Sequence, residues 1–326
     1  MQSIIRQTEA ALFAGAVLDR ETAGKLARIE GSDIYTLMDV ARRVRDHFGA
    51  GKVDLCSIVN AKSGACSEDC RFCAQSAHHQ ACVKTYDLLD PDAIVGRARV
   101  MEAEGAHRFS LVTSGRGMSD AELEPVLAIY ERLRRETKLS LCASLGILNE
   151  AQLRRLAEAG VTMYHHNLEA SRRFFPQICT THSYDERIAT IRAAQAAGMV
   201  VCSGGIFSMG ETIDDRIDMA FELRELGIRS VPINILNPIA GTPLEGQPLI
   251  PPLEILKSIA LYRLILPSAR IRMAGGREGA LRDLQSLPFI AGADAALVGS
   301  YLTTSGRTVA EDIQMLRDLG LNVNNL

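Results

Sequence analysis

The sequence predicts an α/β fold, a (β/α)8 TIM barrel that carries a helical extension at its N-terminus. From residue 53 to the C-terminus, a short β-rich run is followed by a longer amphipathic stretch, and this unit recurs eight times. Such alternation is typical of a parallel sheet with crossover helices. The length of 326 residues also suits one barrel with an extension. A doubly wound open sheet is the alternative, but it needs a switch point, and the repeat shows no break.

The start of the chain is expected to be helical. We expect residues 1–50 to form the extension and residues 51–326 to form the barrel, within one domain, because no low-complexity linker separates them. Segment 32–49 is the clearest helix, since it begins with Ser and Asp and ends with Gly. The apolar run 10–18 has the length of a signal-peptide core, but acidic residues bracket it and no clear cleavage site follows. An amphipathic first helix is the better interpretation.

The candidate strands are short runs in which β-branched and aromatic residues are frequent. They cover residues 53–59, 108–114, 139–144, 162–168, 199–206, 230–236, 270–276 and 295–300. Alternate side chains of a barrel strand point into the interior. Polar residues and cysteines at alternate positions are therefore candidates for a site inside the barrel.

The segments between these strands carry helix start and stop signals. Segment 90–105 opens with Asp-Pro and ends in Gly, and segment 149–160 opens with an Asn cap and also ends in Gly. Segments 183–198 and 211–227 follow the same pattern. These signals support a helix after each strand.

Composition excludes several classes of function. The formal net charge is -3 and like charges form no block, which argues against a nucleic-acid partner. No apolar run approaches the roughly 18 residues of a membrane span, so no membrane is expected. Without export, eight cysteines are not expected to form a disulfide framework. In the reducing cytoplasm, where we expect this protein, closely spaced cysteines more often hold metal or do redox work.

Three cysteines are concentrated in one loop. Cys66, Cys70 and Cys73 form C-x3-C-x2-C directly after the first predicted strand, at the rim where barrel active sites are built. Structural zinc sites use four ligands, whereas three thiolates on a four-iron cubane leave one iron open. An open iron can bind the amino and carboxylate groups of S-adenosylmethionine. A zinc site completed by His78 or His79 is the alternative, but these histidines lie too near for a zinc-finger loop.

This loop resembles the signature of the radical S-adenosylmethionine superfamily, in which an aromatic residue, here Phe72, usually precedes the last cysteine. From about residue 50 to 320, further motifs are similar, in order, to those of the biotin synthase family. These motifs are YHHNLEAS, CSGGI…GETIDDR, VPINILNPIAGTPL, IRMAGGRE and YLTT. Several motifs at matching intervals are far more specific than the cysteine loop alone.

The resemblance implies a role for a second set of cysteines. Cys142 and Cys202 lie on predicted strands and, taken alone, could simply be small buried side chains. In the common form of the family, three strand cysteines and an arginine hold an auxiliary cluster, usually [2Fe-2S]. Cys142, Cys202 and Arg272 match these ligands, but the remaining position is Ser110, a much poorer partner for iron than a thiolate.

The serine places the usual auxiliary cluster in doubt. We hypothesise that Cys56, Cys179 or both replace the lost ligand in a differently built cluster, for which a four-iron type is the candidate. Neither of these two cysteines matches a cysteine of the common form. Cys82 lies in a polar loop and is expected to be incidental.

The resemblance implies a sulfur-inserting enzyme that converts dethiobiotin to biotin and uses S-adenosylmethionine and a [4Fe-4S] cluster. It implies a homodimer, and a flavodoxin- or ferredoxin-type protein would supply electrons. Cys66, Cys70, Cys73 and Arg272 are the expected catalytic set. The implied cofactor contacts are Phe72, Glu169 and Arg187, and the implied substrate contacts are Asn167, Asn234, Thr303 and Thr304.

The local sequence supports these polar residues to different degrees. Asn167 and Glu169 alternate with Leu168, which would place both on one face of a strand, a costly arrangement unless they bind something. Arg187 could instead pair with neighbouring acids on a solvated helix. Arg272 within a strand needs a partner, either a cluster or an ordinary ion pair.

Two other functions compete with this one. A non-catalytic iron–sulfur carrier would explain the cysteines but not a barrel with inward asparagines. Another small radical enzyme, similar to the hydrogenase maturases or methylornithine synthases, would share the barrel and the loop. Such an enzyme would not need Cys142, Cys202 and Arg272.

Overall fold

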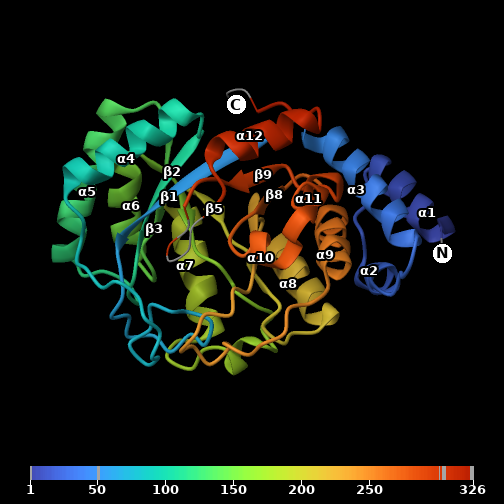
Figure 1. The fold of residues 1–326 in the computed structure, drawn as a ribbon, viewed down its shortest axis with the longest axis horizontal. Helices are drawn as coiled ribbons and strands as arrows, with labels where there is room; N and C mark the ends of the chain where they lie inside the picture. The colour runs from blue at the N-terminus through green and yellow to red at the C-terminus, as the bar shows by residue number, and fades with distance from the viewer. Residues whose placement is uncertain (1, 50–51, 301, 303–305, 324–326) are drawn as a thin grey trace.

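The computed structural model describes residues 2–49, 52–300, 302 and 306–323, and its centre is a closed parallel barrel (Figure 1). β5 and β6 are two pieces of one barrel strand, since both pair with β7, and β1 closes the sheet by pairing with β2 and β9. The (β/α)8 prediction is confirmed. The strand segments are β1 (Asp54–Lys62), β2 (Arg108–Thr113), β3 (Ser140–Ser144), β4 (Val161–His165), β5 (Val200–Cys202), β6 (Gly205–Phe207), β7 (Ser230–Ile235), β8 (Arg270–Met273) and β9 (Ala295–Leu297).

One predicted strand is interrupted. The sequence predicted a continuous strand over 199–206, but the ladder breaks between β5 and β6. At this break a Cβ atom on Gly204 would lie 1.9 Å from the carbonyl oxygen of Pro232, so only glycine allows the backbone to approach so closely. The Gly204 N–H, freed from the ladder, donates to the side-chain oxygen of Asn167 at 3.1 Å. The break therefore serves to hold an inward-facing amide.

Helices cover the outside of the barrel. Capping boxes open α5, α6, α7, α8 and α12, and the predicted starts at Asn149 and Ser183 are confirmed. Asp90 caps α4, which ends at Gly105 in the left-handed conformation, as predicted. The helices are α4 (Pro91–Glu104), α5 (Asp120–Glu136), α6 (Glu150–Glu158), α7 (Tyr184–Ala196), α8 (Ile213–Glu225), α9 (Pro252–Ile265), α10 (Arg277–Leu281), α11 (Leu287–Ile290) and α12 (Val309–Asp318), with 3-10 turns η1 (Phe175–Gln177) and η2 (Arg282–Leu284).

The N-terminal extension consists of α1 (Gln2–Phe13), α2 (Arg20–Ala27) and α3 (Asp33–Gly49), as expected. These helices lie together at the right-hand end of Figure 1, where α3 packs against α1 and α9. Leu37, Val40 and Val44 of α3 are fully buried. The apolar run 10–18 is not one continuous helix, since α1 ends at Phe13. Among the described residues, no helix has the length and apolar character that crossing a membrane requires.

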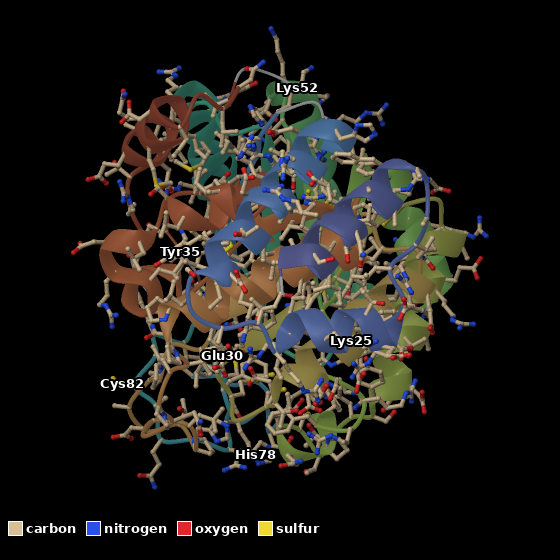
Figure 2. All side chains as sticks on the ribbon, turned by 90° about the vertical axis from the view of Figure 1, so that its right-hand side faces the viewer. Lys25, Glu30, Tyr35, Lys52, His78 and Cys82 are labelled. Carbon is tan, nitrogen blue, oxygen red and sulfur yellow. The ribbon has the colours of Figure 1, made fainter. Side chains whose placement is uncertain are left out.

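The two ends of the barrel differ in their loops. Figure 2 shows Lys52, which precedes β1, at the opposite end of the molecule from His78 and Cys82, which follow the cysteine loop. The cysteine loop therefore lies at the carboxyl end of the strands. That end is where the loops of this fold assemble active sites.

A buried ion pair fixes the chain between α9 and β9. The Arg263 guanidinium donates to Asp294 at 2.8 Å, and the same carboxylate accepts the Ile271 N–H of β8 at 2.7 Å. Both side chains are almost completely shielded from water. Removing one partner of such a pair leaves an uncompensated buried charge.

We predict that Asp294→Leu lowers the free energy of unfolding by about 3–5 kcal/mol, because Arg263 loses its counter-charge. Urea titration followed by circular dichroism measures this change. The control is Lys25→Gln, which breaks an exposed pair with Glu21 and should leave the free energy of unfolding nearly unchanged, because water screens this pair. Equal effects of the two variants would contradict the structural role of the buried pair.

Candidate active site

The three-cysteine loop folds back on itself through backbone hydrogen bonds. The Cys66 N–H donates to the Gln75 carbonyl at 2.9 Å, and the Cys66 carbonyl accepts from Ala77 at 2.8 Å. The Cys73 N–H donates to the Cys70 carbonyl at 2.9 Å. These bonds hold the three cysteines in one compact loop after β1, and Cys73 reaches the barrel cavity.

Two thiols of this loop, those of Cys70 and Cys73, are poorly hydrated. Burial raises the pKa of Cys73 to about 11, and a hydrogen bond to Cys179 together with burial raises the pKa of Cys70. Thiols in this state ionise only beside strong positive charge, which bound iron supplies. The donor set of Cys66, Cys70 and Cys73 thus fits an iron–sulfur cluster. Nε2 of His78 contacts the Ser67 carbonyl at 2.9 Å and Nε2 of His79 contacts the Cys70 carbonyl at 3.0 Å, and among the described residues neither histidine belongs to a group of metal-ligating side chains.

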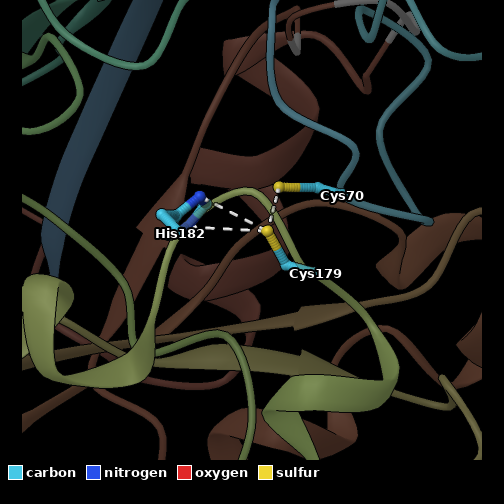
Figure 3. A group of neighbouring side chains, drawn as sticks. All are labelled: Cys70, Cys179 and His182. Atoms are coloured by element: carbon cyan, nitrogen blue, oxygen red, sulfur yellow. Dashed lines mark hydrogen bonds between the residues drawn. The ribbon is translucent and has the colours of Figure 1, made fainter.

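A second loop, which follows η1, packs against the cysteine loop. The Asp69 carboxylate accepts the Thr180 N–H at 2.9 Å, and the Arg71 N–H donates to the Ile178 carbonyl at 2.9 Å. This contact brings Cys179 beside Cys70, with 3.6 Å between the two sulfur atoms (Figure 3). Cys179 therefore lies at the mouth of the barrel.

A cavity of about 360 Å³ occupies the barrel below this loop. Phe72, Cys73 and Gln75 of the loop line its mouth, and Ile206 and Leu297 are among its apolar wall residues. A concave and mostly apolar pocket with a few inward polar groups is typical of a small-molecule site. Its position at the carboxyl end of the strands makes it the candidate active site.

A second group of thiols lines the inner part of the cavity. Cys56 of β1, Cys142 of β3 and Cys202 of β5 all face inward and are buried. The Cys56 and Cys142 thiols interact directly, and donation from Cys142 lowers the pKa of Cys56. Burial raises the pKa of Cys202. Cys56 thus lies with Cys142 and Cys202, the two cysteines that were expected to face one cavity. Cys179 is not part of this group.

Ser110 lies on β2, between the strands that carry Cys56 and Cys142. Its hydroxyl faces the cavity and donates only a long bond of 3.5 Å to the Leu111 carbonyl. Ser110 therefore places a hydroxyl on the strand between those of Cys56 and Cys142.

Arg272 of β8 brings positive charge to these thiols. Its guanidinium donates to the Asp54 carboxylate at 3.2 Å and to the carbonyls of Asp54 and Ala296 at 3.2 Å. Burial alone would lower the pKa of Arg272, but Asp54 and the thiols Cys56 and Cys202 outweigh it and raise that pKa. The guanidinium is therefore firmly charged, and it stabilises ionised sulfur beside it.

Polar side chains near the mouth form a linked set. The Asn167 amide donates to Glu169 at 3.2 Å, and Arg187 donates to the Asn167 carbonyl at 2.9 Å. Burial raises the pKa of Glu169 despite Arg187 at 3.9 Å. The expectation that Asn167 and Glu169 lie on a strand is wrong, because β4 ends at His165 and Glu169 has φ +69°. Both nevertheless line the cavity.

Arg187 is buried rather than solvated, so its alternative interpretation as a surface ion pair is wrong. Its guanidinium lies 5.2 Å above the Phe175 ring, and its buried Nε has no hydrogen-bond partner among the described residues. A buried donor without a partner is costly. Arg187 also lies 3.9 Å from Glu169, which lines the cavity.

The remaining expected contacts are placed as follows. Asn234 of β7 lines the cavity, and its side-chain oxygen accepts the Gly275 N–H at 3.0 Å. Thr303 and Thr304 lie outside the described residues. Cys82 is exposed, in keeping with an incidental role.

Sequence reasoning missed Asp54 and His165. Asp54 begins β1 with its carboxylate fully buried between Arg108 and Arg272. His165 lines the cavity two residues before Asn167, and burial lowers its pKa, so the ring is neutral near pH 7. The available signal for Asp54 was a charged residue at the start of a strand. For His165 it was the alternation of side chains along β4.

Comparison with known proteins identifies related sequences over nearly the whole chain. A model of the radical SAM superfamily matches residues 61–223, and a Biotin and Thiamin Synthesis associated domain matches residues 232–322. Biotin synthase of Pelotomaculum thermopropionicum is 55% identical over 95% of this chain and 97% of its own. Biotin synthase of Carboxydothermus hydrogenoformans is 51% identical over 98% and 99%.

Solved structures of more distant proteins share the fold. Methylornithine synthase aligns with a TM-score of 0.85 at 21% identity, over 97% of this chain and 96% of its own. The [FeFe]-hydrogenase maturase HydG aligns with a TM-score of 0.83 at 14% identity, over 98% and 76%. At such identities the likeness concerns the barrel alone.

We predict a pH-dependent contribution of Asp54 to stability. Burial tends to raise the pKa of this carboxyl, but Arg272 and Arg108 outweigh it and hold the pKa at about 2, below the ordinary 3.8. Ionised Asp54 therefore stabilises the fold above about pH 4, and this contribution of about 2 kcal/mol is lost as the pH falls toward about 2.

Urea unfolding of the wild type and of Asp54→Asn at a series of pH values measures this contribution. The difference in unfolding free energy between them should be constant from about pH 5 to 8 and should shrink below about pH 4. A difference that stays constant down to about pH 2.5 would contradict the depressed pKa.

Proposed function

The chain belongs to the biotin synthase family of radical S-adenosylmethionine enzymes, and from this premise we propose which of its residues carry the reaction. The enzyme inserts sulfur into dethiobiotin to form biotin. The residue assignment rests on one observation: two separate sets of cysteine thiols lie along the same cavity. Cys73 reaches its mouth, and Cys56, Cys142 and Cys202 line its inner part.

The upper group would hold a [4Fe-4S] cluster through Cys66, Cys70 and Cys73. Three thiolates would leave one iron of such a cluster without a protein ligand and open to S-adenosylmethionine. When bound, these cofactors supply a carbon radical strong enough to break an unactivated C–H bond, which no side-chain base can do. Phe72 offers an aromatic wall at the mouth. Glu169 and the unpartnered Nε of Arg187 offer an acceptor and a donor for the polar parts of S-adenosylmethionine.

The lower group would hold the auxiliary cluster through Cys56, Cys142 and Cys202, with Arg272 beside them. When bound, this cluster supplies the inorganic sulfide for the product. Cys56 takes the role that Ser110 cannot fill, because a thiolate binds iron far better than a hydroxyl. Three thiolates with Arg272 suit a [2Fe-2S] or a four-iron cluster, and iron analysis distinguishes these two types. Cys179 has no part in this assignment because it lies beside Cys70.

The residues between the two groups position the substrate. The apolar wall of the cavity, which includes Ile206 and Leu297, excludes water that would quench a reactive intermediate. Asn167 and Asn234 present amides that suit the ureido ring of dethiobiotin. Neutral His165 faces the same space. Holding the reacting carbon between the two metal sites is the main contribution of the protein to catalysis.

We further propose a homodimer that receives electrons from a flavodoxin- or ferredoxin-type protein in the cytoplasm. The described cysteines are all free thiols, which suits a reducing compartment. The fold likeness to methylornithine synthase and the hydrogenase maturase does not favour their functions, since it concerns the barrel alone. The lower thiols argue against the functions of both relatives, and the inward-facing amides of Asn167 and Asn234 argue against an iron–sulfur carrier.

The assigned reaction predicts biotin formation by the anaerobically reconstituted protein with dethiobiotin, S-adenosylmethionine and a reductant. Mass spectrometry measures biotin and 5′-deoxyadenosine in the same sample. Absence of 5′-deoxyadenosine would indicate a carrier. 5′-Deoxyadenosine without biotin would indicate another radical enzyme.

The assignment of Cys56 predicts that Cys56→Ser keeps S-adenosylmethionine cleavage but forms no biotin. The variant should retain about four irons per chain, those of the upper cluster, and lose the lower two to four. Cys82→Ser is the matched control and should behave as wild type, because Cys82 is exposed. A Cys56→Ser variant with wild-type iron content and biotin yield would contradict this assignment.

A further inference from the structure

A third group of metal-ligating side chains lies outside the two cluster sites, apart from one shared residue. Cys179 and His182 follow η1, and Cys70 belongs to the cysteine loop; their donor atoms all lie within 4.8 Å of one another. Figure 3 shows the three side chains pointing toward a common point. All three are buried, and the proposed reaction uses neither Cys179 nor His182.

The distances in this group match the edges of a single tetrahedral metal site. Two thiolates at about 2.3 Å from one zinc ion lie about 3.8 Å apart, and a thiolate and an imidazole nitrogen lie about 3.6 Å apart. Here the sulfur atoms of Cys70 and Cys179 are 3.6 Å apart. The Cys179 sulfur is 3.8 Å from Nε2 of His182, the ring nitrogen that can bind an ion, and 3.3 Å from Nδ1, which bonds Glu68. Ligands of two different irons in a cluster lie farther apart than ligands of one ion.

The histidine is oriented as in many metal sites. Its Nδ1–H donates to the Glu68 carboxylate, which is itself buried and accepts from Thr181 at 2.8 Å. This bond fixes the tautomer and leaves the Nε2 lone pair for an ion. A carboxylate behind a ligating imidazole is a common arrangement that strengthens metal binding.

We infer that Cys70, Cys179 and His182 form a site for one thiophilic divalent cation of the zinc class when the upper cluster is absent. Two thiolates and one imidazole are the ligands that zinc prefers, and a water molecule can fill the fourth position. Because Cys70 serves both sites, the cation and the upper cluster exclude each other. This exclusion rests on the proposed function, whereas the cation site itself does not.

Cobalt(II) titration of the full-length, iron-free protein under anaerobic conditions tests the site. Tetrahedral cobalt–thiolate centres absorb in the visible, and we expect such a band to be displaced by zinc. Cys179→Ser should lose the band. Glu68→Gln should weaken cobalt binding by about 10–100-fold, because the imidazole loses its supporting carboxylate. Circular dichroism of each variant checks that the barrel is intact.

Two control variants separate this site from the cluster sites. Cys66→Ser and Cys142→Ser should each keep the band that Cys179→Ser loses, since Cys66 serves only the upper cluster and Cys142 only the lower group. A band that persists in Cys179→Ser, or that is lost equally in Cys66→Ser, would overturn the proposed cation site.

Cluster assembly tests the exclusion. Zinc added before iron and sulfide should slow the appearance of the [4Fe-4S] absorption in the wild type but not in Cys179→Ser. Equal rates in the wild type with and without zinc would overturn the exclusion. The cobalt titration uses protein without clusters, so its result does not depend on the proposed function. Failure to cleave S-adenosylmethionine would count against the proposed function but not against the cation site.

Discussion

The cost of placing ionised sulfur inside a barrel is the constraint on which this structure depends. A buried thiolate is unfavourable unless positive charge lies beside it. At the inner end of the cavity, that charge is Arg272, and Asp54 holds its guanidinium in place at 3.2 Å. The Asp54 carboxylate is in turn stabilised by Arg108 at 2.7 Å. The contacts from β2 through β1 to β8 therefore hold positive charge beside the inner thiols before any metal is bound.

Much of the fold followed from local sequence signals. The cap at Asn149, the Asp-Pro start at residue 90 and the glycines that end the helices were visible in the sequence, and the structure confirms the predicted alternation. The break between β5 and β6 was not predictable, because it depends on how closely Gly204 approaches Pro232 of a neighbouring strand. The end of β4 at His165 was missed for a similar reason, since Asn167 leaves the ladder to bond Gly204.

The candidate site was likewise predictable from the sequence only in part. Alternation along a strand was enough to predict that Cys142 and Cys202 face one cavity. It could not decide between Cys56 and Cys179 as the replacement for a missing thiol. That choice depends on which strand lies beside β2 and on how the loop after η1 packs against the cysteine loop. The structure groups Cys56 with Cys142, and Cys179 with Cys70.

The proposed function requires metal at two depths of one cavity. An anaerobic crystal structure of the reconstituted enzyme, with anomalous scattering recorded at the iron edge, would locate this metal. We expect two separate iron peaks, one beside Cys66, Cys70 and Cys73 and one between Cys56, Cys142 and Cys202. A single peak at the mouth, with none among the inner thiols, would contradict it.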